Sequence, residues 1–256
     1  MDSKRSMLNE NELLYSQQVH KYTKMSVQGG YSGSLVDLCM EAAERMSNQS
    51  LLAIWKLVSD MTKNISLPSG KTPLQQRSQP DVQQQLIDSA RSHLEQNYYQ
   101  FIEETVISNL REAVRGAVPG TEKLIEAFLK VRKINLRTFE DGELWAMIYY
   151  CLRCGQVNAA VEIAKKKSGQ IGDFYTYLKA WAMVTDDSPV PRRLTPNQLN
   201  QLKIQYRRSV RTSTDPYKRA VYSIIGKCDT DMHQDVIEKT DDYLWLKLSQ
   251  VIMHRM

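Results

Sequence analysis

Glycine and proline are scarce in this sequence, with 11 glycines and 8 prolines among 256 residues. An all-β fold needs many tight turns, so this scarcity argues against one. No run of 18 apolar residues occurs, so the sequence predicts no transmembrane helix. The apolar fraction of 42% is ordinary and argues against general disorder. These features leave a globular helical chain that is long enough to bury a sizeable core.

Motifs that carry chemistry are equally scarce. Cys151 and Cys154 form a CxxC, but no second ligand pair of the kind that zinc needs accompanies them. The pair also lies at the end of a helical pattern, whereas redox pairs lie at a helix N-terminus. We therefore interpret both cysteines as ordinary buried or half-buried thiols. The glycine-rich residues 29–33 lack the Lys-Ser/Thr of a phosphate loop, and the four histidines lie far apart.

Together these absences predict a protein that is not an enzyme. We expect no catalytic, cofactor-binding or metal-ligating residue, no cofactor and no small-molecule substrate. No apolar segment follows the charged first residues, so no secretory signal is expected, and the cysteines should be reduced thiols of the cytosol or nucleus.

The apolar residues recur at helical spacings of three and four along nearly the whole chain. The longest unbroken pattern runs from Val82 to Ala113 and predicts one long helix that begins at Pro80 and ends near Gly116. Shorter helical patterns follow at residues 124–129, 145–152, 157–167, 171–184, 196–211, 216–227 and from 241 to the end. Thr195-Pro196 and Asp215-Pro216 each place a capping side chain before a proline at the first helical position.

Amphipathic helices joined by short loops pack as antiparallel hairpins, and stacked hairpins form an α-solenoid. The sequence therefore predicts an all-α fold, either an irregular solenoid or, on pattern alone, a compact bundle. We expect residues 1–33 to form an N-terminal helix and a partly flexible joint. Residues 34–256 should form the solenoid portion, with surface loops near 64–79 and 185–195.

Positive charge is concentrated in one stretch, residues 192–219, which holds eight basic residues and a single acid, Asp215. Five of these basic residues are candidate partner-binding residues: Lys203, Arg207, Arg211, Lys218 and Arg219. The first three are spaced by four and should share one helical face. Such a face either binds an acidic partner, phosphate or a membrane surface, or is a solvated helix face that also pairs with acids of a neighbouring helix. Only Tyr206 and Tyr217 interleave it, which argues against single-stranded nucleic acid.

The C-terminal pattern is strongly apolar almost to the end of the chain, in Tyr243, Leu244, Trp245, Leu248, Val251, Ile252 and Met253. The last repeat of a solenoid normally carries a polar outer face, because no further repeat covers it. We therefore expect a truncated chain whose last helix exposes a contiguous apolar patch.

Several ordered segments resemble the nucleoporin-interacting component family. They are VPGT at 118–121, Trp145 with IYYCLRCG at 148–155, DPYKRAVY at 215–222, IIG at 224–226, CD at 228–229 and TDDYLWLKL at 240–248. Lesser similarity extends to residues 35–39 and 94–96. The matches run from about residue 35 to the C-terminus, and none of them is a reaction motif.

The resemblance implies an α-solenoid that bridges other scaffold nucleoporins in the inner ring of the nuclear pore, without enzyme activity or cofactor. Localisation would be the nucleus, at the pore in the nuclear envelope, with membrane proximity only through the pore. Family members carry a long N-terminal region and a longer solenoid, so this chain would be the N-terminal part of the solenoid. The alternative function is a helical domain that binds nucleic acid or an anionic membrane through residues 192–219.

Overall fold

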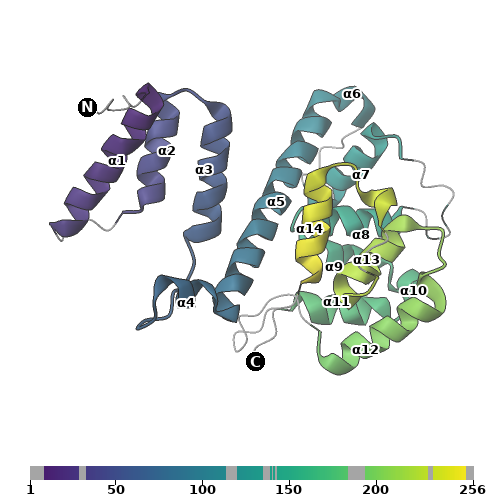
Figure 1. Cartoon of the computed structure of the whole chain (residues 1–256). Coiled ribbons are helices and arrows are strands. Elements are labelled where there is room, and N and C mark those ends of the chain that lie inside the picture. Colours follow the sequence, from purple (N-terminus) through teal and green to yellow (C-terminus); the bar gives the residue numbers. More distant parts are fainter. Residues whose placement is uncertain are drawn as a thin grey trace. The chain divides into compact units, whose positions relative to one another are not determined.

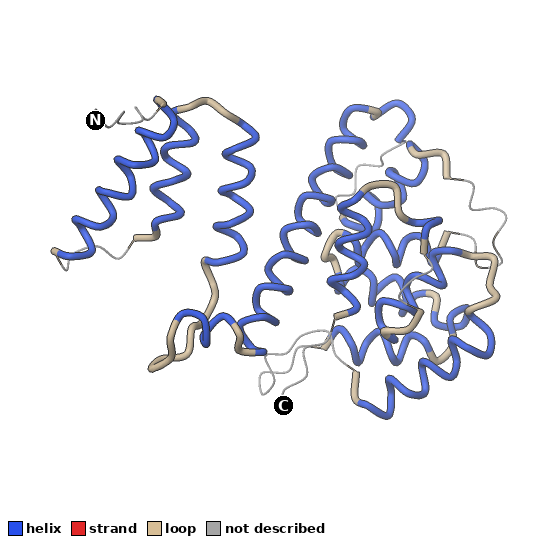
Figure 2. The backbone as a smooth tube through the Cα atoms, in the orientation of Figure 1, coloured by secondary structure: helices blue, strands red, loops and turns tan. Residues whose placement is uncertain are grey.

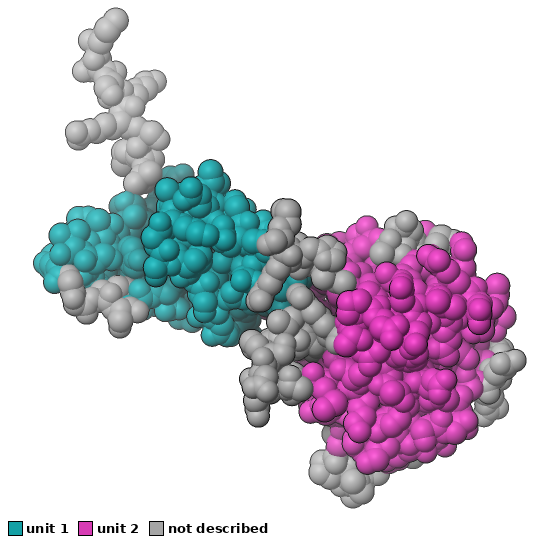
Figure 3. All heavy atoms as spheres, turned by 90° about the horizontal axis from the view of Figure 1, so that it is seen from below, with its two compact units in different colours: residues 1–90 teal, residues 91–256 magenta. Residues whose placement is uncertain are grey.

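Helices account for all regular secondary structure that the computed structural model of the chain describes. The described residues are 9–28, 33–113, 120–134, 139, 141, 143–183, 194–229 and 233–251, and these ranges contain no strand (Figure 2). The prediction of an all-α fold is confirmed. The chain divides into two compact units, residues 1–90 and 91–256 (Figure 3), and each is described by itself.

The first unit is a layer of three helices followed by a short one. Its elements are α1 (Glu10–Val27), α2 (Leu35–Arg45), α3 (Gln49–Thr62), α4 (Pro73–Arg77) and the first residues of α5 (Pro80–Ser108). The middle helix, α2, packs against both α1 and α3 (Figure 1). Capping boxes at Asn9 and Ser34 begin α1 and α2, because each side chain accepts a backbone N–H that the first helical turn leaves free.

Few side chains are buried in this layer. α2 buries Leu38, Cys39, Ala42 and Ala43, whereas α3 buries none of its residues, although most of them are apolar. One polar contact links the outer helices: the indole Nε1 of Trp55 in α3 donates to the hydroxyl of Tyr15 in α1 at 2.8 Å. The layer is therefore held by small residues and by partly exposed aromatic side chains.

The second unit is built around α8. Its helices are the remainder of α5, α6 (Leu110–Ala113), α7 (Thr121–Val131), α8 (Leu144–Arg153), α9 (Val157–Lys166), α10 (Ser168–Ile171), α11 (Phe174–Ala182), α12 (Pro196–Gln205), η1 (Tyr206–Val210), α13 (Pro216–Gly226), η2 (Gln234–Val236) and α14 (Thr240–Gln250). All ten residues of α8 are buried, because α7, α9 and α13 pack around it.

Aromatic side chains tie these helices together. The ring of Trp145 in α8 lies 5.0 Å from Phe174 in α11, and Phe174 lies 4.4 Å from Tyr222 in α13. Contacts of this kind bury large apolar areas and add a specific ring geometry. The core of the second unit is therefore continuous from α5 to α14.

The predicted long helix is wrong in one respect. It begins at Pro80 as expected, but α5 ends at Ser108 and a separate short helix, α6, follows. The side chain of Asn109 donates to the carbonyl of Thr105 at 2.8 Å, and its backbone N–H bonds Val106 at 3.2 Å, three residues back. Asparagine favours such local bonds, which interrupt the regular α-helical ladder. The predicted end, Gly116, lies outside the described residues.

The predicted surface loops and boundary have different outcomes. Residues 64–79 are largely exposed but include α4, a helix that was not predicted. A capping box of Thr72 and Gln75 and a proline at the first helical position, Pro73, begin this helix. Most of residues 185–195 lie outside the described residues. The boundary near residue 33 remains a prediction, and the two compact units meet at a different position, between Ala90 and Arg91.

Candidate functional site

The predicted basic face lies on α12 and its continuation η1. Thr195 caps α12 as expected, with Gln198 completing the capping box, and Pro196 takes the first helical position. Arg207, Arg208 and Arg211 are exposed and Lys203 is half-buried. We call these four residues the basic row. None of the four forms an ion pair with another described residue.

A widened turn keeps the basic row aligned. Residues 206–210 form a π-helix, in which the N–H of Arg211 bonds the carbonyl of Tyr206, five residues back. In a regular α-helix, residues spaced by four drift around the axis by about 40° per step. Here Leu202, Tyr206 and Val210 all remain in the core, at 0%, 2% and 2% exposure. The wide turn corrects this drift. Lys203, Arg207 and Arg211, each of which follows one of these core residues, therefore also lie along one line.

Two predicted partner-binding residues are instead engaged within the chain. The Lys218 ammonium lies 3.1 Å from an Asp141 carboxylate oxygen and over the ring of Trp145. The Arg219 guanidinium lies 2.7 Å from Asp235. The structure therefore does not bring all five predicted residues together. Lys203, Arg207 and Arg211 lie on α12 and η1 without an ion pair to another described residue, and Arg208 beside them is exposed as well.

The surroundings limit the extent of the row. A polar pocket of about 280 Å³ lies beyond it, lined by Asp141, Ser209, Thr212, Ser213, Thr214, Asp215 and Lys218. Asp215 accepts bonds from the N–H groups of Tyr217 and Lys218 as the cap of α13, and its burial raises its pKa. Two acids and one lysine line this pocket, so the cationic surface ends at Arg211.

The aromatic residues near the row are not available at its surface. Tyr206 is buried, and its hydroxyl donates to Asp229 at 2.6 Å. Tyr217 is buried as well. Base stacking needs an exposed ring, so neither tyrosine can provide a platform for nucleic acid in this fold.

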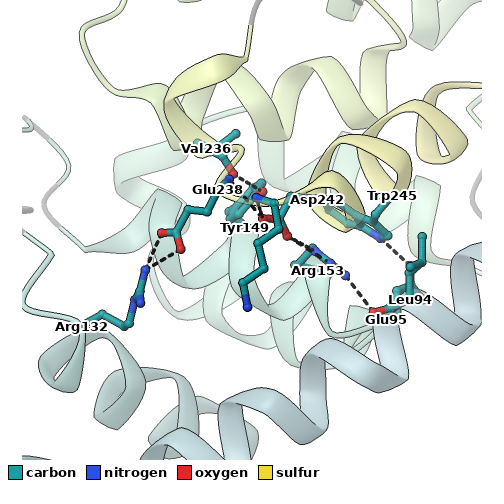
Figure 4. Close-up of polar contacts among 10 residues, drawn as sticks. Leu94, Glu95, Arg132, Tyr149, Arg153, Val236, Glu238, Asp242 and Trp245 are labelled. Atoms are coloured by element: carbon teal, nitrogen blue, oxygen red, sulfur yellow. Dashed lines mark hydrogen bonds and ion pairs between the residues drawn. The ribbon is translucent and has the colours of Figure 1, made fainter. Parts of the chain in front are cut away.

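A buried polar junction that the sequence analysis did not predict holds the second unit together (Figure 4). Arg153 at the end of α8 is 2% exposed, and its guanidinium donates to Asp242 of α14 at 3.1 Å and to the carbonyl of Leu94 in α5 at 2.9 Å. The same guanidinium lies 4.1 Å from the ring centre of Tyr98. One cation therefore joins three helices far apart in sequence.

Asp242 also closes the start of α14. Its second oxygen accepts the N–H groups of Glu238 and Lys239 at 3.2 and 3.0 Å. The helix begins at Thr240, and Asp242 in its first turn is buried. Burial is possible because Arg153 neutralises the carboxylate and the backbone saturates its oxygens.

A close approach of backbone and side chain completes the junction. The indole of Trp245 donates to Glu95 of α5 at 3.2 Å. Gly155, just after α8, has a φ of +71°, and a Cβ there would lie 2.7 Å from a carboxylate oxygen of Glu95. Only glycine fits both the backbone conformation and the space.

The cysteine pair has the character expected of buried thiols. Cys151 and Cys154 are both buried, and burial raises the pKa of each, that of Cys151 to about 12. A thiol with a raised pKa is a poor nucleophile and a poor metal ligand near neutral pH. Among the described residues, no cluster of three or more His, Cys, Asp or Glu side chains could hold a metal ion. The described helices include none with the length and apolar character needed to cross a bilayer.

The last helix is better covered than the sequence suggested. Trp245 is buried against Tyr149 and Arg153, and Leu246 is buried as well. The exposed apolar residues of the expected patch are Tyr243, Leu244 and Val251, with Leu248 half-buried. Ile252 and Met253 lie outside the described residues.

Successive helices that pack against one another, such as α1 to α3 and α7 to α9, and a cationic row without ion pairs to other described residues define the class of the molecule: an α-solenoid protein with a candidate protein-binding surface. The fold matches the crystal structure of Chaetomium thermophilum Nic96 SOL with a TM-score of 0.73 and 17% identity, over 94% of this chain and 37% of that one. The predicted irregular solenoid of antiparallel hairpins is confirmed. The family model described as Nup93/Nic96 matches residues 49–255, and the chain belongs to the Nup93/Nic96 family.

Relatives from distant organisms agree with this assignment. The nuclear pore complex protein Nup93 of Xenopus laevis is 42% identical over 254 residues, which cover 96% of this chain and 30% of the relative. Nucleoporin NIC96 of Saccharomyces cerevisiae is 26% identical, over 82% of this chain and 24% of the relative. The chain therefore spans about 30% of the length of the vertebrate relatives it matches.

Proposed function

We propose that this chain is a scaffold segment of the nuclear pore complex, located at the nuclear envelope, which bridges other nucleoporins through its surfaces and has no enzyme activity. In this way it would support pore assembly and nucleocytoplasmic transport. The observation that carries the proposal is the family match over residues 49–255, together with relatives named as nuclear pore complex proteins.

The geometry supports a role in binding rather than in catalysis. Two buried charges of the second unit, Arg153 and Asp242, are engaged with each other and are closed off from solvent. Three of the cysteines are buried and Cys228 is half-buried, and the basic row gathers exposed charge without ion pairs to other described residues on one helix face. We propose Lys203, Arg207 and Arg211, together with Arg208, as partner-binding residues, while Lys218 and Arg219 stabilise the fold.

The alternative of a domain that binds nucleic acid or an anionic membrane has no support from the relatives. The burial of Tyr206 and Tyr217 also argues against it, because neither ring can stack on a base.

Localisation of the tagged full chain in living cells tests the proposal. We expect a continuous rim signal at the nuclear envelope and chemical cross-links from the chain to other nucleoporins. A uniformly diffuse signal, without cross-links to nucleoporins, would contradict the proposal.

Matched charge reversals test the proposed surface within the same experiment. We expect K203E/R207E/R211E to lose cross-links near α12 while the protein remains folded. The control, K130E/K165E/K179E, reverses three exposed lysines that form no ion pair with other described residues. Equal loss in both variants would show an effect of net charge alone, and no loss in either would show that the row is only solvated.

A further inference from the structure

We infer that the basic row binds one acidic, amphipathic helix of a partner protein, with three carboxylates on the helix facing Lys203, Arg207 and Arg211. The inference rests on the proposed scaffold function and adds the chemistry and shape of the partner. It follows from the alignment of the row, its spacing, its limits and the residues beside it.

The spacing fits a helix. Lys203, Arg207 and Arg211 of the row are four residues apart, which is about 6 Å along the helix axis at about 1.5 Å per residue. A partner helix with acids at positions i, i+4 and i+7 keeps them on one side with a similar rise, so each carboxylate can meet one cation. The π-helix at residues 206–210 keeps these cations in line, and such turns are frequent at functional sites.

The helix face beside Lys203, Arg207 and Arg211 supplies an apolar contact. Ile204 follows Lys203 and is 50% exposed, and it is the one exposed large hydrophobic residue among described residues 194–229. Arg208 lies one turn further along the same side. A partner helix that carries an apolar side chain beside its acids would cover Ile204, which purely electrostatic binding would leave exposed.

The limits of the row set the number of acids. Beyond Arg211 the pocket is lined by Asp141 and Asp215 with only Lys218 as a cation, so a further acid would meet like charge. The carboxylate of Asp229 already accepts the hydroxyl of Tyr206, which lies between Lys203 and Arg207 in the sequence. The row therefore accommodates about two turns of an acidic helix.

The same observations disfavour other macromolecules. Nucleic acid would lack an exposed aromatic ring on this face, because Tyr206 and Tyr217 are buried. A membrane would need several exposed apolar side chains to insert, and Ile204 alone does not supply them.

Binding of designed peptides to the full chain tests the inference. The first peptide is an alanine-based helix with three glutamates at positions i, i+4 and i+7 and a leucine beside the first. The second has the same composition but places the glutamates at a spacing that scatters them around the helix. Fluorescence anisotropy at moderate salt should show that the first peptide binds about tenfold more tightly, because three aligned ion pairs replace scattered ones.

A charge swap sharpens the test. K203E/R207E/R211E should lose the preference for the first peptide and gain binding to its version with lysines in place of the glutamates, whereas K130E/K165E/K179E should behave as the unmodified chain. Binding of K203E/R207E/R211E to the lysine version of the peptide can arise only if the variant folds.

Three results would overturn the inference: equal binding of the two peptides, stronger binding of single-stranded oligothymidine than of the first peptide, or stronger binding of phosphatidylserine vesicles. Rim localisation of the full chain is a separate measurement. If the rim signal is present and peptide selection is absent, only this inference fails. If selection is present and the rim signal is absent, the proposed function fails.

Discussion

The two units are built from the same kind of helix, yet they hold their helices together by different means. The first unit buries five hydrophobic residues among those described, and three of them are small: Cys39, Ala42 and Ala43. The second unit buries whole aromatic rings from α7, α8, α11, α13 and α14, and adds the ion pair between Arg153 and Asp242. Packing energy and specific geometry are therefore concentrated in residues 91–251.

The difference follows from the number of layers. In the first unit α2 has helices on two sides, whereas α3 packs against α2 and its apolar residues remain partly or fully exposed. In the second unit α8 is enclosed by α7, α9 and α13 and buries every residue. A helix at the edge of one layer loses little apolar surface to folding, whereas an enclosed helix loses nearly all of it. Local stability should differ accordingly between the two units.

Replacing Arg153 by alanine should remove most of the difference in stability between the two units. The change leaves Asp242 buried without its cation, and breaking a buried pair in this way costs about 3–5 kcal/mol. Denaturant unfolding, followed by the near-ultraviolet signal of the second unit, measures the loss. The control is Arg132→Ala, whose partner Glu238 is half-exposed, and which should cost no more than about 1 kcal/mol. Equal losses in the two variants would show that the junction does not distinguish the second unit.

Replacing Gly155 by alanine should weaken the same junction by a different route. The alanine would hold a positive φ and place its Cβ 2.7 Å from Glu95, so Glu95 must shift away from Trp245. We expect a loss of about 1–3 kcal/mol in the free energy of unfolding. Gly169→Ala is the control, because an added Cβ there meets no atom within 4 Å. If Gly169→Ala is as destabilising as Gly155→Ala, the close approach is not the cause.

The helices and several caps were accessible from the sequence, because they depend on local patterns. Apolar spacing located most helices, and the caps at Thr195 and Asp215 were predicted correctly. The junction was not predicted, because Arg153 and Asp242 lie 89 residues apart. One signal was present: Arg153 is the single charge in a helix that is otherwise apolar, and such a charge needs a buried partner.

The candidate site was predicted in part for the same reason. The spacing of four predicted that Lys203, Arg207 and Arg211 share one helix face. In a regular helix they would drift around the axis, and the π-helix that keeps them in line leaves no clear sequence pattern. Lys218 and Arg219 read as equivalent cations, but their partners Asp141 and Asp235 become neighbours only in the folded chain. Charge composition therefore located the basic stretch, residues 192–219. Tertiary contacts decide which of its described cations form ion pairs within the chain.

A smaller effect is expected in the first unit from Trp55→Phe. The change removes the hydrogen bond to Tyr15 but keeps an aromatic ring, so the loss should be about 0.5–1.5 kcal/mol. Hydrogen exchange should report it in α1 to α3 and leave α8 unchanged. The matched variant, Trp245→Phe, removes an indole that donates to the buried Glu95, and it should cost more and affect α5, α8 and α14. Loss of protection in α8 on Trp55→Phe would mean that the two units unfold together.

The smallest effect concerns pH and again separates the units. His233 in the second unit is buried, and desolvation by burial lowers its pKa from 6.5. Arg219 and Lys247 lower it further, while Asp229 acts in the opposite direction. The histidine of the first unit, His20, is exposed.

Because the folded pKa of His233 lies below its unfolded value, the unfolded chain binds the proton first as the pH falls. The contribution of neutral His233 is therefore fully present above pH 6.5 and is lost below it, until the pH reaches the lower folded pKa. One proton limits the slope to about 1.4 kcal/mol for each pH unit. Denaturant unfolding of the second unit at pH 7.5 and at more acidic pH should show a smaller acid-induced loss in His233→Gln than in the unmodified chain. An identical loss in both would assign the acid sensitivity to other groups, since glutamine fills similar space but cannot take up the proton.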